Sequence, residues 1–428
     1  MNALRRRRIV CTAGLVLLAA TFTGSAAGQA PPRAEGFGAI AAGGEGGRII
    51  WVTNLNDSGP GSFRDAVTAD GPRVVRFKVG GVIVLSDTIR VRSGQLTIDG
   101  LSAAEYGGIT LFGRGIAFEG LECSGVIVHN IRVRRSARGG DCITVKDGAH
   151  RVLIDHCSVS WADDENIGVN KGHYVTIQWC VIAEGLIEGD HEKGAHPCGM
   201  LVAHGANHVT IHHNYFAGNA IRNPLVFGVG GVGSGGAWPG CYPGEKMAVF
   251  MPNGLYDIRN NLVYNFTSGT ELAEGMYVNV VGNYYRFGPD DFPLVYPPSS
   301  GRGMPVHLLL KTYYPGSEQP KVFCEGNIGP RQPEGNEDEW GLVYVGGVGE
   351  EGAWGKPRGC RSDAPFLTPP VKTHTAKKAM KLVLKQAGAY PRDEVDRRLV
   401  EEFRNGTGKM GYGYRAWADA RGLTLDGE

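Results

Sequence analysis

The clearest candidates for chemistry in this sequence are acidic residues beside short β-like runs. Asp163, Asp164 and Glu165 follow the run that includes 154–157, and Asp141 stands at the start of the preceding run. If consecutive runs stack in parallel, these acids fall beside one another on one edge. Carboxylates gathered in this way suit a hard cation such as Ca²⁺, which takes oxygen ligands. A solvated acidic turn is the alternative, and the spacing alone does not decide between the two.

Two basic residues in the same region could bind an anion beside such a cation. Lys193 lies in a long insertion, and Arg222 opens the motif R-N-P. Arginine offers a planar fork to a carboxylate, whereas lysine supplies a point charge. Together they predict a site for an anionic substrate, although Lys193 taken alone would be interpreted as an ordinary surface residue.

Histidines are concentrated between residues 191 and 213. Their spacing matches no helical zinc motif, so we interpret most of them as structural residues or as walls of the site. His191 is retained as a candidate substrate contact. His212 and His213 lie within one run and should point to opposite faces of it.

The elements that must position these residues are six central runs with one repeated pattern, at 126–131, 152–157, 175–180, 209–214, 256–261 and 278–283. Their starts recur about every 22 to 26 residues where no loop intervenes, which is typical of a solenoid. In a parallel coil, equivalent residues of successive turns stack about 4.8 Å apart. The sixth positions should therefore form a ladder in which asparagine amides hydrogen-bond one another. These positions are Ile131, Cys157, Cys180, Asn214, Asn261 and Asn283.

This pattern predicts an all-β fold, a right-handed parallel β-helix that spans residues 31–370. A β-sandwich is the alternative, but it would favour antiparallel hairpins at shorter spacing. Long interruptions at 182–206 and 227–254 are candidate binding loops on a rigid scaffold. Residues 371–428 are predicted to form a helical tail, with helices at 375–386 and 393–404, which packs on the solenoid or caps its end.

The composition supports a globular protein and limits its partners. Of the 428 residues, 42% are hydrophobic, enough for a real core. The 66 glycines follow no collagen period and indicate many tight turns. A net charge of +1 excludes a strong general attraction to nucleic acid or to an acidic polymer, so any polyanion site must be local.

The N-terminus predicts export. Four arginines at 5–8 precede an apolar run at 9–20 and then small residues, the pattern of a signal peptide over about residues 1–30. The run is short for a membrane span of about 20 residues. We therefore expect a secreted protein, extracellular or periplasmic, without a membrane anchor after cleavage, and by default a monomer.

Cysteine use leaves the disulfides open. An even number of cysteines remains after the signal peptide, and in an exported chain this permits disulfides. They are widely spread without a C-x-x-C pair, which argues against a zinc site. Cys157 and Cys180 occupy equivalent places in neighbouring runs, so stacked thiols and a bridge are both open.

Several segments taken together resemble the pectate lyases of the polysaccharide lyase family that folds as a right-handed parallel β-helix. The resemblance covers nearly all of the chain after the signal peptide, and it depends on the order and number of the segments. They are V-T-N-L-N-D-S-G-P-G-S-F-R-D-A-V (52–67), I-D-H-C-S-V-S-W-A-D-D-E (154–165), V-T-I-Q-W-C-V-I-A-E-G (175–185), R-N-P (222–224), D-I-R-N-N-L-V-Y-N (257–265), N-V-V-G-N-Y-Y-R-F-G-P (279–289), A-G-A-Y-P-R-D-E-V-D-R-R-L-V (387–400) and R-N-G-T-G (404–408).

The resemblance implies calcium-assisted β-elimination of α-1,4-linked polygalacturonate, an acidic plant-type polysaccharide. It implies that Arg222 is the catalytic arginine, acting as base or as stabiliser of the anion. Lys193 resembles the family's substrate-binding lysine. The implied calcium ligands are Asp141, Asp164 and Glu165, with Asp163 a weaker member.

One departure keeps two other functions open. Many pectate lyases carry a second arginine shortly after R-x-P, whereas Leu225, Val226 and Phe227 follow here. A polygalacturonase-like hydrolase would need one acid to activate water and another to protonate the leaving group. Asp163 and Asp164 could form such a pair. A non-catalytic carbohydrate-binding β-helix is the third possibility.

Overall fold

The computed structural model describes residues 34–137, 139–189, 191–192, 194–228, 254–290, 306–311, 318–334, 339–347, 350–355, 359–411 and 413–423. The residues from Ala34 onward form one unit by their contacts. The predicted signal peptide, Lys193 and most of the glycine-rich insertion after Phe227 lie outside the described residues.

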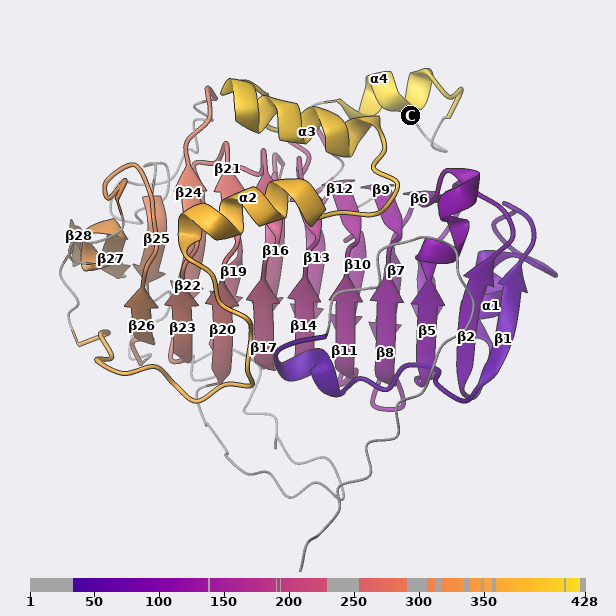
Figure 1. Cartoon of the computed structure of the whole chain (residues 1–428), viewed down its shortest axis with the longest axis horizontal. Coiled ribbons are helices and arrows are strands. Elements are labelled where there is room, and N and C mark those ends of the chain that lie inside the picture. Colours follow the sequence, from indigo (N-terminus) through magenta and orange to yellow (C-terminus); the bar gives the residue numbers. More distant parts are fainter. Residues whose placement is uncertain are drawn as a thin grey trace, which may run out of the picture. The chain divides into compact units, whose positions relative to one another are not determined.

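Short strands wind in successive coils, and each central coil contributes one strand to each of three sheets (Figure 1). Sheet A contains, in spatial order, β1 (Arg48–Val52), β2 (Arg73–Phe77), β5 (Leu96–Asp99), β8 (Ser124–His129), β11 (His150–Asp155), β14 (His173–Gln178), β17 (Asn207–His212), β20 (Leu255–Arg259), β23 (Tyr277–Val281) and β26 (Lys321–Glu325). Sheet B contains β3 (Gly81–Val84), β6 (Ile109–Gly113), β9 (Arg132–Ser136), β12 (Ser158–Ala162), β15 (Val181–Ala183), β18 (Tyr215–Ala217), β21 (Leu262–Tyr264) and β24 (Tyr284–Arg286). Sheet C contains β4 (Ile89–Val91), β7 (Ile116–Glu119), β10 (Ile143–Lys146), β13 (Glu165–Asn170), β16 (Cys198–Ala203), β19 (Leu225–Phe227), β22 (Ser268–Ala273), β25 (Val306–Lys311), β27 (Val343–Gly347) and β28 (Glu350–Trp354).

Pairing within these sheets is parallel, except that β27 and β28 pair antiparallel. The predicted right-handed parallel β-helix is therefore confirmed, and the β-sandwich is excluded. The register is regular: β11 pairs with β8 and with β14 so that Ile154 stands between Val128 and Ile177. Equivalent residues of neighbouring coils thus lie beside one another, as the repeat predicts.

The turn from sheet A to sheet B is built from one residue with positive φ followed by the ladder position. The residues with positive φ in six successive coils are Asn130, His156, Trp179, His213, Asn260 and Gly282. A single left-handed residue bends the chain sharply between two strands, and bulky residues adopt this conformation rarely. The bend sets the direction in which each following strand of sheet B leaves.

The predicted asparagine ladder is confirmed at this turn. Asn261 Oδ1 accepts hydrogen bonds from the backbone N–H and the side-chain Nδ2 of Asn214, both at 3.0 Å. Asn283 Oδ1 accepts the same pair from Asn261, at 2.9 and 3.0 Å. Asn327, which the repeat does not reveal, extends the ladder by one coil. Each amide therefore satisfies buried polar groups of its neighbour.

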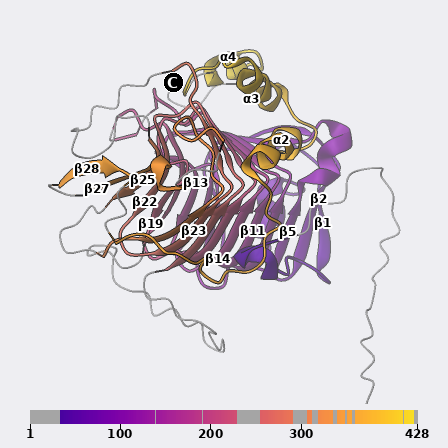
Figure 2. The same ribbon diagram turned by 60° about the vertical axis from the view of Figure 1, so that its left-hand side comes forward.

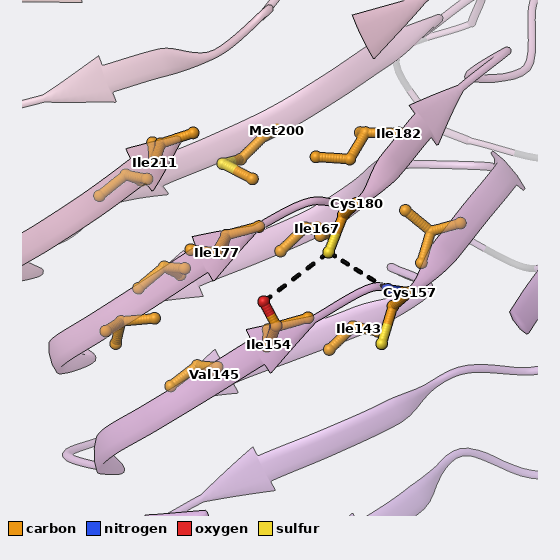
Figure 3. Close-up of a cluster of buried hydrophobic side chains, with 14 of the residues drawn as sticks. Ile143, Val145, Ile154, Cys157, Ile167, Ile177, Cys180, Ile182, Met200 and Ile211 are labelled. Carbon is orange, nitrogen blue, oxygen red and sulfur yellow. Dashed lines mark hydrogen bonds between the residues drawn. The ribbon is translucent and has the colours of Figure 1, made fainter. Parts of the chain in front are cut away.

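The core is a stack of apolar side chains that point inward from the three sheets (Figure 3). Ile154, Ile177 and Ile211 are stacked there, and each is at most 1% exposed. Cys157 and Cys180 are stacked thiols without a bridge between them, and the Cys180 Sγ lies 3.4 Å from the backbone nitrogen of Cys157. The sulfur atoms occupy ladder positions as small apolar groups.

Helices lie outside the coils. They are η1 (Phe37–Ile40), α1 (Phe63–Thr68), η2 (Gly100–Tyr106), η4 (Glu339–Leu342), α2 (Ala376–Gln386), α3 (Glu394–Asn405) and α4 (Tyr414–Asp419). Ser62 caps α1 by accepting a hydrogen bond from the Asp65 N–H. Figure 2 shows α2, α3 and α4 along one side of the stacked coils.

The C-terminal helices cover sheet B through apolar contacts and buried charges. Leu399, Phe403 and Trp417 pack with Trp161 and other side chains that sheet B directs outward. In addition, the guanidinium group of Arg134, on β9, lies 2.7 Å from Asp396 and 3.0 Å from Asp393 of the α3 start. These contacts fix the sheet B side of the corner that leads to sheet C.

Candidate functional site

The corner between sheets B and C brings together the residues that the sequence singles out. Asp141 stands just before β10, Asp164 and Glu165 join β12 to β13, and Arg222 stands just before β19. Because β10, β13, β16 and β19 are neighbours in sheet C, residues at this corner lie on adjacent coils. Loops at such a corner can diverge in sequence while the sheets hold their ends in place.

Asp141, Asp164 and Glu165 form a compact carboxylate cluster. One ligand oxygen from each lies within 4.8 Å of the others. Asp141 is fixed by two hydrogen bonds: its Oδ1 accepts the Glu165 N–H at 3.1 Å, and its Oδ2 accepts the Thr144 hydroxyl at 3.1 Å. The donor set consists of oxygens, which fits a hard cation such as Ca²⁺.

A glycine makes room for this cluster. Gly168, on β13, lies so close to Asp141 that a Cβ atom at residue 168 would stand 2.1 Å from Asp141 Oδ2. The pKa of Asp141 is raised to about 7, mainly because burial disfavours the charged form and also because Asp164 is nearby. A bound cation would relieve this repulsion, so both observations fit a cation beside Asp141.

Asp164 experiences opposing effects. Burial alone would raise its pKa, but the contact with His196 and the charges of His196, His191 and Arg222 lower the pKa overall. Asp164 is also partly exposed, with 27% of its side chain accessible, whereas the Glu165 side chain is 3% exposed. Asp164 is therefore well placed to stay ionised and to meet a ligand from solvent.

Arg222 lies on the same cluster. Its guanidinium group forms an ion pair with Glu165, and 13% of the Arg222 side chain is exposed. The backbone has positive φ, and its N–H donates to Glu271 Oε1 at 3.1 Å. The Nε atom makes no hydrogen bond to any residue the structure describes. A fixed backbone and an incompletely paired guanidinium group suit an anionic ligand.

Asp163, the weaker candidate of the triplet, has a different environment. Its carboxylate forms a buried ion pair with Arg135 and accepts the Gly139 N–H at 3.2 Å. The Arg135 guanidinium group lies 5.0 Å from the ring of Tyr414, in α4. Asp163 is 1% exposed and stands outside the carboxylate cluster of Asp141, Asp164 and Glu165. The Asp163 carboxylate therefore neutralises Arg135, the residue that contacts α4.

Two histidines of the long loop between β15 and β16 also reach Asp164. The Nε2 atoms of His191 and His196 lie 3.5 and 3.2 Å from Asp164 Oδ1, and their rings stack at 4.4 Å with an interplanar angle of 8°. His191 thus lies beside the carboxylates, where a residue that contacts the substrate would have to lie. Lys193, from the same loop, lies outside the described residues.

The residues after R-N-P continue directly into the sheet. Leu225 and Val226 belong to β19 and are 2% and 0% exposed. No second arginine stands at these positions, so Arg222 is the arginine that β19 brings to the cluster.

Sequence reasoning missed three residues of this corner. His196 was grouped with structural histidines, Glu271 carried no motif, and Gly168 was one glycine among 66. Only the stacking of coils reveals Glu271 and Gly168, because their partners are distant in sequence. His196 had a usable signal, since it shares the long loop with His191 and Lys193.

Comparison with curated sequences finds pectate lyases. The chain is 39% identical over 267 residues to "Probable pectate lyase C" of Aspergillus terreus, covering 60% of this chain and 54% of that protein. It is 37% identical over 307 residues to the protein of the same name from Aspergillus flavus, covering 70% and 63%. The chain thus spans little more than half the length of the first of these relatives. No family model matches the chain.

Solved structures with the same fold include pectate lyases. One, from work on substrate specificity and the anti-β-elimination mechanism of pectate lyase, aligns with a TM-score of 0.52 at 12% identity, covering 85% of this chain and 99% of that one. The thermostable pectate lyase PL 47 gives 0.51 at 14% identity, with 84% and 97% covered. At these identities the likeness concerns the fold. Over the residues described, no helix is long and apolar enough to cross a membrane.

Proposed function

We propose, from the relation of this chain to pectate lyases in sequence and in fold, that it is a secreted pectate lyase that cleaves α-1,4-linked polygalacturonate by β-elimination. The observation that carries the proposal is the placement of Arg222 against the carboxylates of Asp141, Asp164 and Glu165 at one corner of the coils. An arginine beside a cation-binding acid cluster matches a substrate that carries a carboxylate on every sugar.

The carboxylate cluster is the part that would hold calcium. Bound by Asp141, Asp164 and Glu165, the ion would neutralise a uronate carboxylate and make the adjacent C5–H more acidic. Asp163 is left out of this set because its charge is already paired with Arg135 inside the protein. The space beside Gly168 keeps the Asp141 carboxylate in reach of the other two.

Arg222 is assigned to the reacting centre. In the elimination a proton leaves C5, a double bond forms between C4 and C5, and the glycosidic oxygen departs from C4 and takes up a proton. A guanidinium group is protonated at ordinary pH. Arg222 is therefore better suited to stabilise the negative charge that develops on the uronate than to accept the C5 proton, although the second role remains the alternative. His191 would hold a substrate carboxylate beside it, and Lys193 keeps the substrate-binding role that the resemblance implies.

The two competing functions are less well supported. A hydrolase needs two carboxyl groups that flank the scissile bond, and Asp163 is buried in an ion pair. A binding module would need no acid cluster next to an arginine. Export is part of the proposal through the basic and apolar N-terminus, and N-terminal sequencing of the exported protein tests it.

The test is the absorbance of unsaturated uronate formed from polygalacturonate, with Ca²⁺ and with a chelator. The parent should form product only with Ca²⁺, and Arg222→Ala should lose at least about 100-fold in kcat, the scale of one removed oxyanion donor. Arg222→Lys should retain part of the rate if charge is the main contribution. Arg361→Ala, an exposed arginine paired with Asp363, serves as the matched control. Reducing ends without this absorbance would instead indicate a hydrolase, and binding without either would indicate a module.

A further inference from the structure

Imidazole nitrogens stand beside the oxygen cluster, and a calcium site has no use for them. Asp164, His191 and His196 offer one ligand atom each within 4.8 Å of one another. Calcium binds oxygen, whereas imidazole favours zinc and other first-row transition metals. The same loop therefore brings a second kind of ligand chemistry to Asp164.

The spacing of these atoms fits a small dication. Zinc–nitrogen and zinc–oxygen bonds of about 2.0–2.1 Å place neighbouring ligands of a tetrahedral site about 3.3 Å apart. The two imidazole Nε2 atoms lie 3.5 Å (His191) and 3.2 Å (His196) from Asp164 Oδ1. Both separations match the edges of such a tetrahedron.

His196 supplies the independent observation. Its side chain is 7% exposed, and its Nε2 atom lies 3.2 Å from Asp164 Oδ1 without the geometry of a hydrogen bond to any described residue. A buried imidazole nitrogen without a hydrogen bond is costly unless a ligand satisfies it. The ring can turn toward an ion without breaking a hydrogen bond of Nε2. His196 also lies within 4.8 Å of ligand atoms of Glu165 and Cys198, so sulfur is nearby as well.

We propose that Asp164, His191 and His196 form a binding site for a first-row transition-metal dication of the Zn²⁺ class, beside the carboxylate cluster. Three protein ligands leave a position open for water or for a substrate oxygen. The site shares Asp164 with the proposed calcium site. It rests on the proposed function only in this respect, that Asp164 is also assigned there as a calcium ligand. His191 acts here as a metal ligand, which would replace its direct contact with substrate whenever the ion is bound.

The experiment titrates metal-free full-length protein with Co²⁺, which reports nitrogen ligands by its visible spectrum, and repeats the titration by calorimetry with Zn²⁺ and with Ca²⁺. His191→Gln and His196→Gln should each weaken Co²⁺ and Zn²⁺ binding at least about tenfold and reduce the visible band. His156→Gln is the matched control, because His156 belongs, with His129 and Asp155, to a histidine-containing group outside this corner. Circular dichroism verifies the fold of each variant. If one of the two histidine variants does not fold, the other still tests the proposal.

The outcomes are distinct from those of the lyase assay. Co²⁺ and Zn²⁺ binding that is unchanged in both His191→Gln and His196→Gln, or lost equally in His156→Gln, would overturn the proposal. Calcium-dependent product formation without Zn²⁺ binding would also overturn it, while the lyase proposal would stand. Zn²⁺ binding that depends on the two histidines, in a protein that forms no unsaturated product, would support the metal site and refute the lyase.

Discussion

Gly168→Ala tests whether the Asp141 carboxylate is a metal ligand. The added Cβ would lie 2.1 Å from Asp141 Oδ2, and real Cβ atoms essentially never come closer than 3.0 Å to another atom. The carboxylate must therefore move by at least about 0.9 Å. Metal–ligand distances tolerate changes of about 0.2 Å, so the displacement is several times what a bound ion accepts. Residue 168 has no positive φ, and alanine should not strain the backbone.

The expected result is a selective loss of metal affinity. Ca²⁺ affinity should fall about 10- to 100-fold, the effect of disturbing the groups that orient a metal ligand, which corresponds to about 1.4–2.7 kcal/mol of binding free energy. Titration calorimetry with Ca²⁺ measures this, and thermal unfolding shows whether the fold is retained.

Gly346→Ala is the matched control, because it adds a Cβ in the same sheet where the nearest atom is Tyr344 Cε1 at 3.5 Å. It should bind Ca²⁺ as the parent does. A folded Gly168→Ala protein with the parent's Ca²⁺ affinity would refute the assignment of Asp141 as a ligand. A loss of equal size in Gly346→Ala would trace the effect to the sheet and not to the carboxylate.

Three further predictions concern the scaffold. Asn261→Ala should destabilise the protein by about 3 kcal/mol in chemical denaturation, because the lost amide leaves buried ladder groups unsatisfied at about 1–3 kcal/mol each, whereas Asn405→Ala on the exposed end of α3 should change little. Burial lowers the pKa of His208 to about 4, so this histidine stays neutral in the folded protein and takes up a proton on unfolding between about pH 6.5 and 4. His208 should therefore contribute a loss of stability of up to about 1.4 kcal/mol for each unit by which the pH falls in this range, and His208→Gln should reduce the measured slope by that contribution, while His173 and His212, which burial also keeps neutral, retain theirs. Arg134→Met should cost about 3–5 kcal/mol in thermal unfolding because it leaves Asp396 as a buried charge, and an unchanged melting temperature would refute that role.

The fold was predictable because it is repetitive. Apolar residues at the first and third positions of each run become the stacked core, and asparagine at the sixth position becomes the ladder. The left-handed residue at each turn was not predictable, because Trp179 has no preference for positive φ and the modest enrichment of histidine there does not single out His156. Their conformation follows from the sheets on either side. Asn327 was hidden because 44 residues separate it from Asn283, well beyond the spacing of the regular runs.

The site was predictable to the level of its charged residues and not beyond. Arg222, Asp141, Asp164 and Glu165 meet at one corner, as stacked runs require. The contact of His196 with Asp164 depends on the path of a long loop, and a sequence without helical or hairpin periodicity does not encode that path in readable form.

The triplet 163–165 shows why identity and spacing alone cannot assign ligands. Consecutive residues of an extended turn point in different directions, so three adjacent carboxylates meet three environments. Asp163 meets Arg135, a residue on β9 that α4 covers; Asp164 meets the histidines; Glu165 meets Arg222. A buried carboxylate already neutralised by arginine gains little from a cation, whereas a cluster of crowded carboxylates gains much. The partner of each acid, contributed by another coil, therefore decides which carboxylates are available to bind an ion.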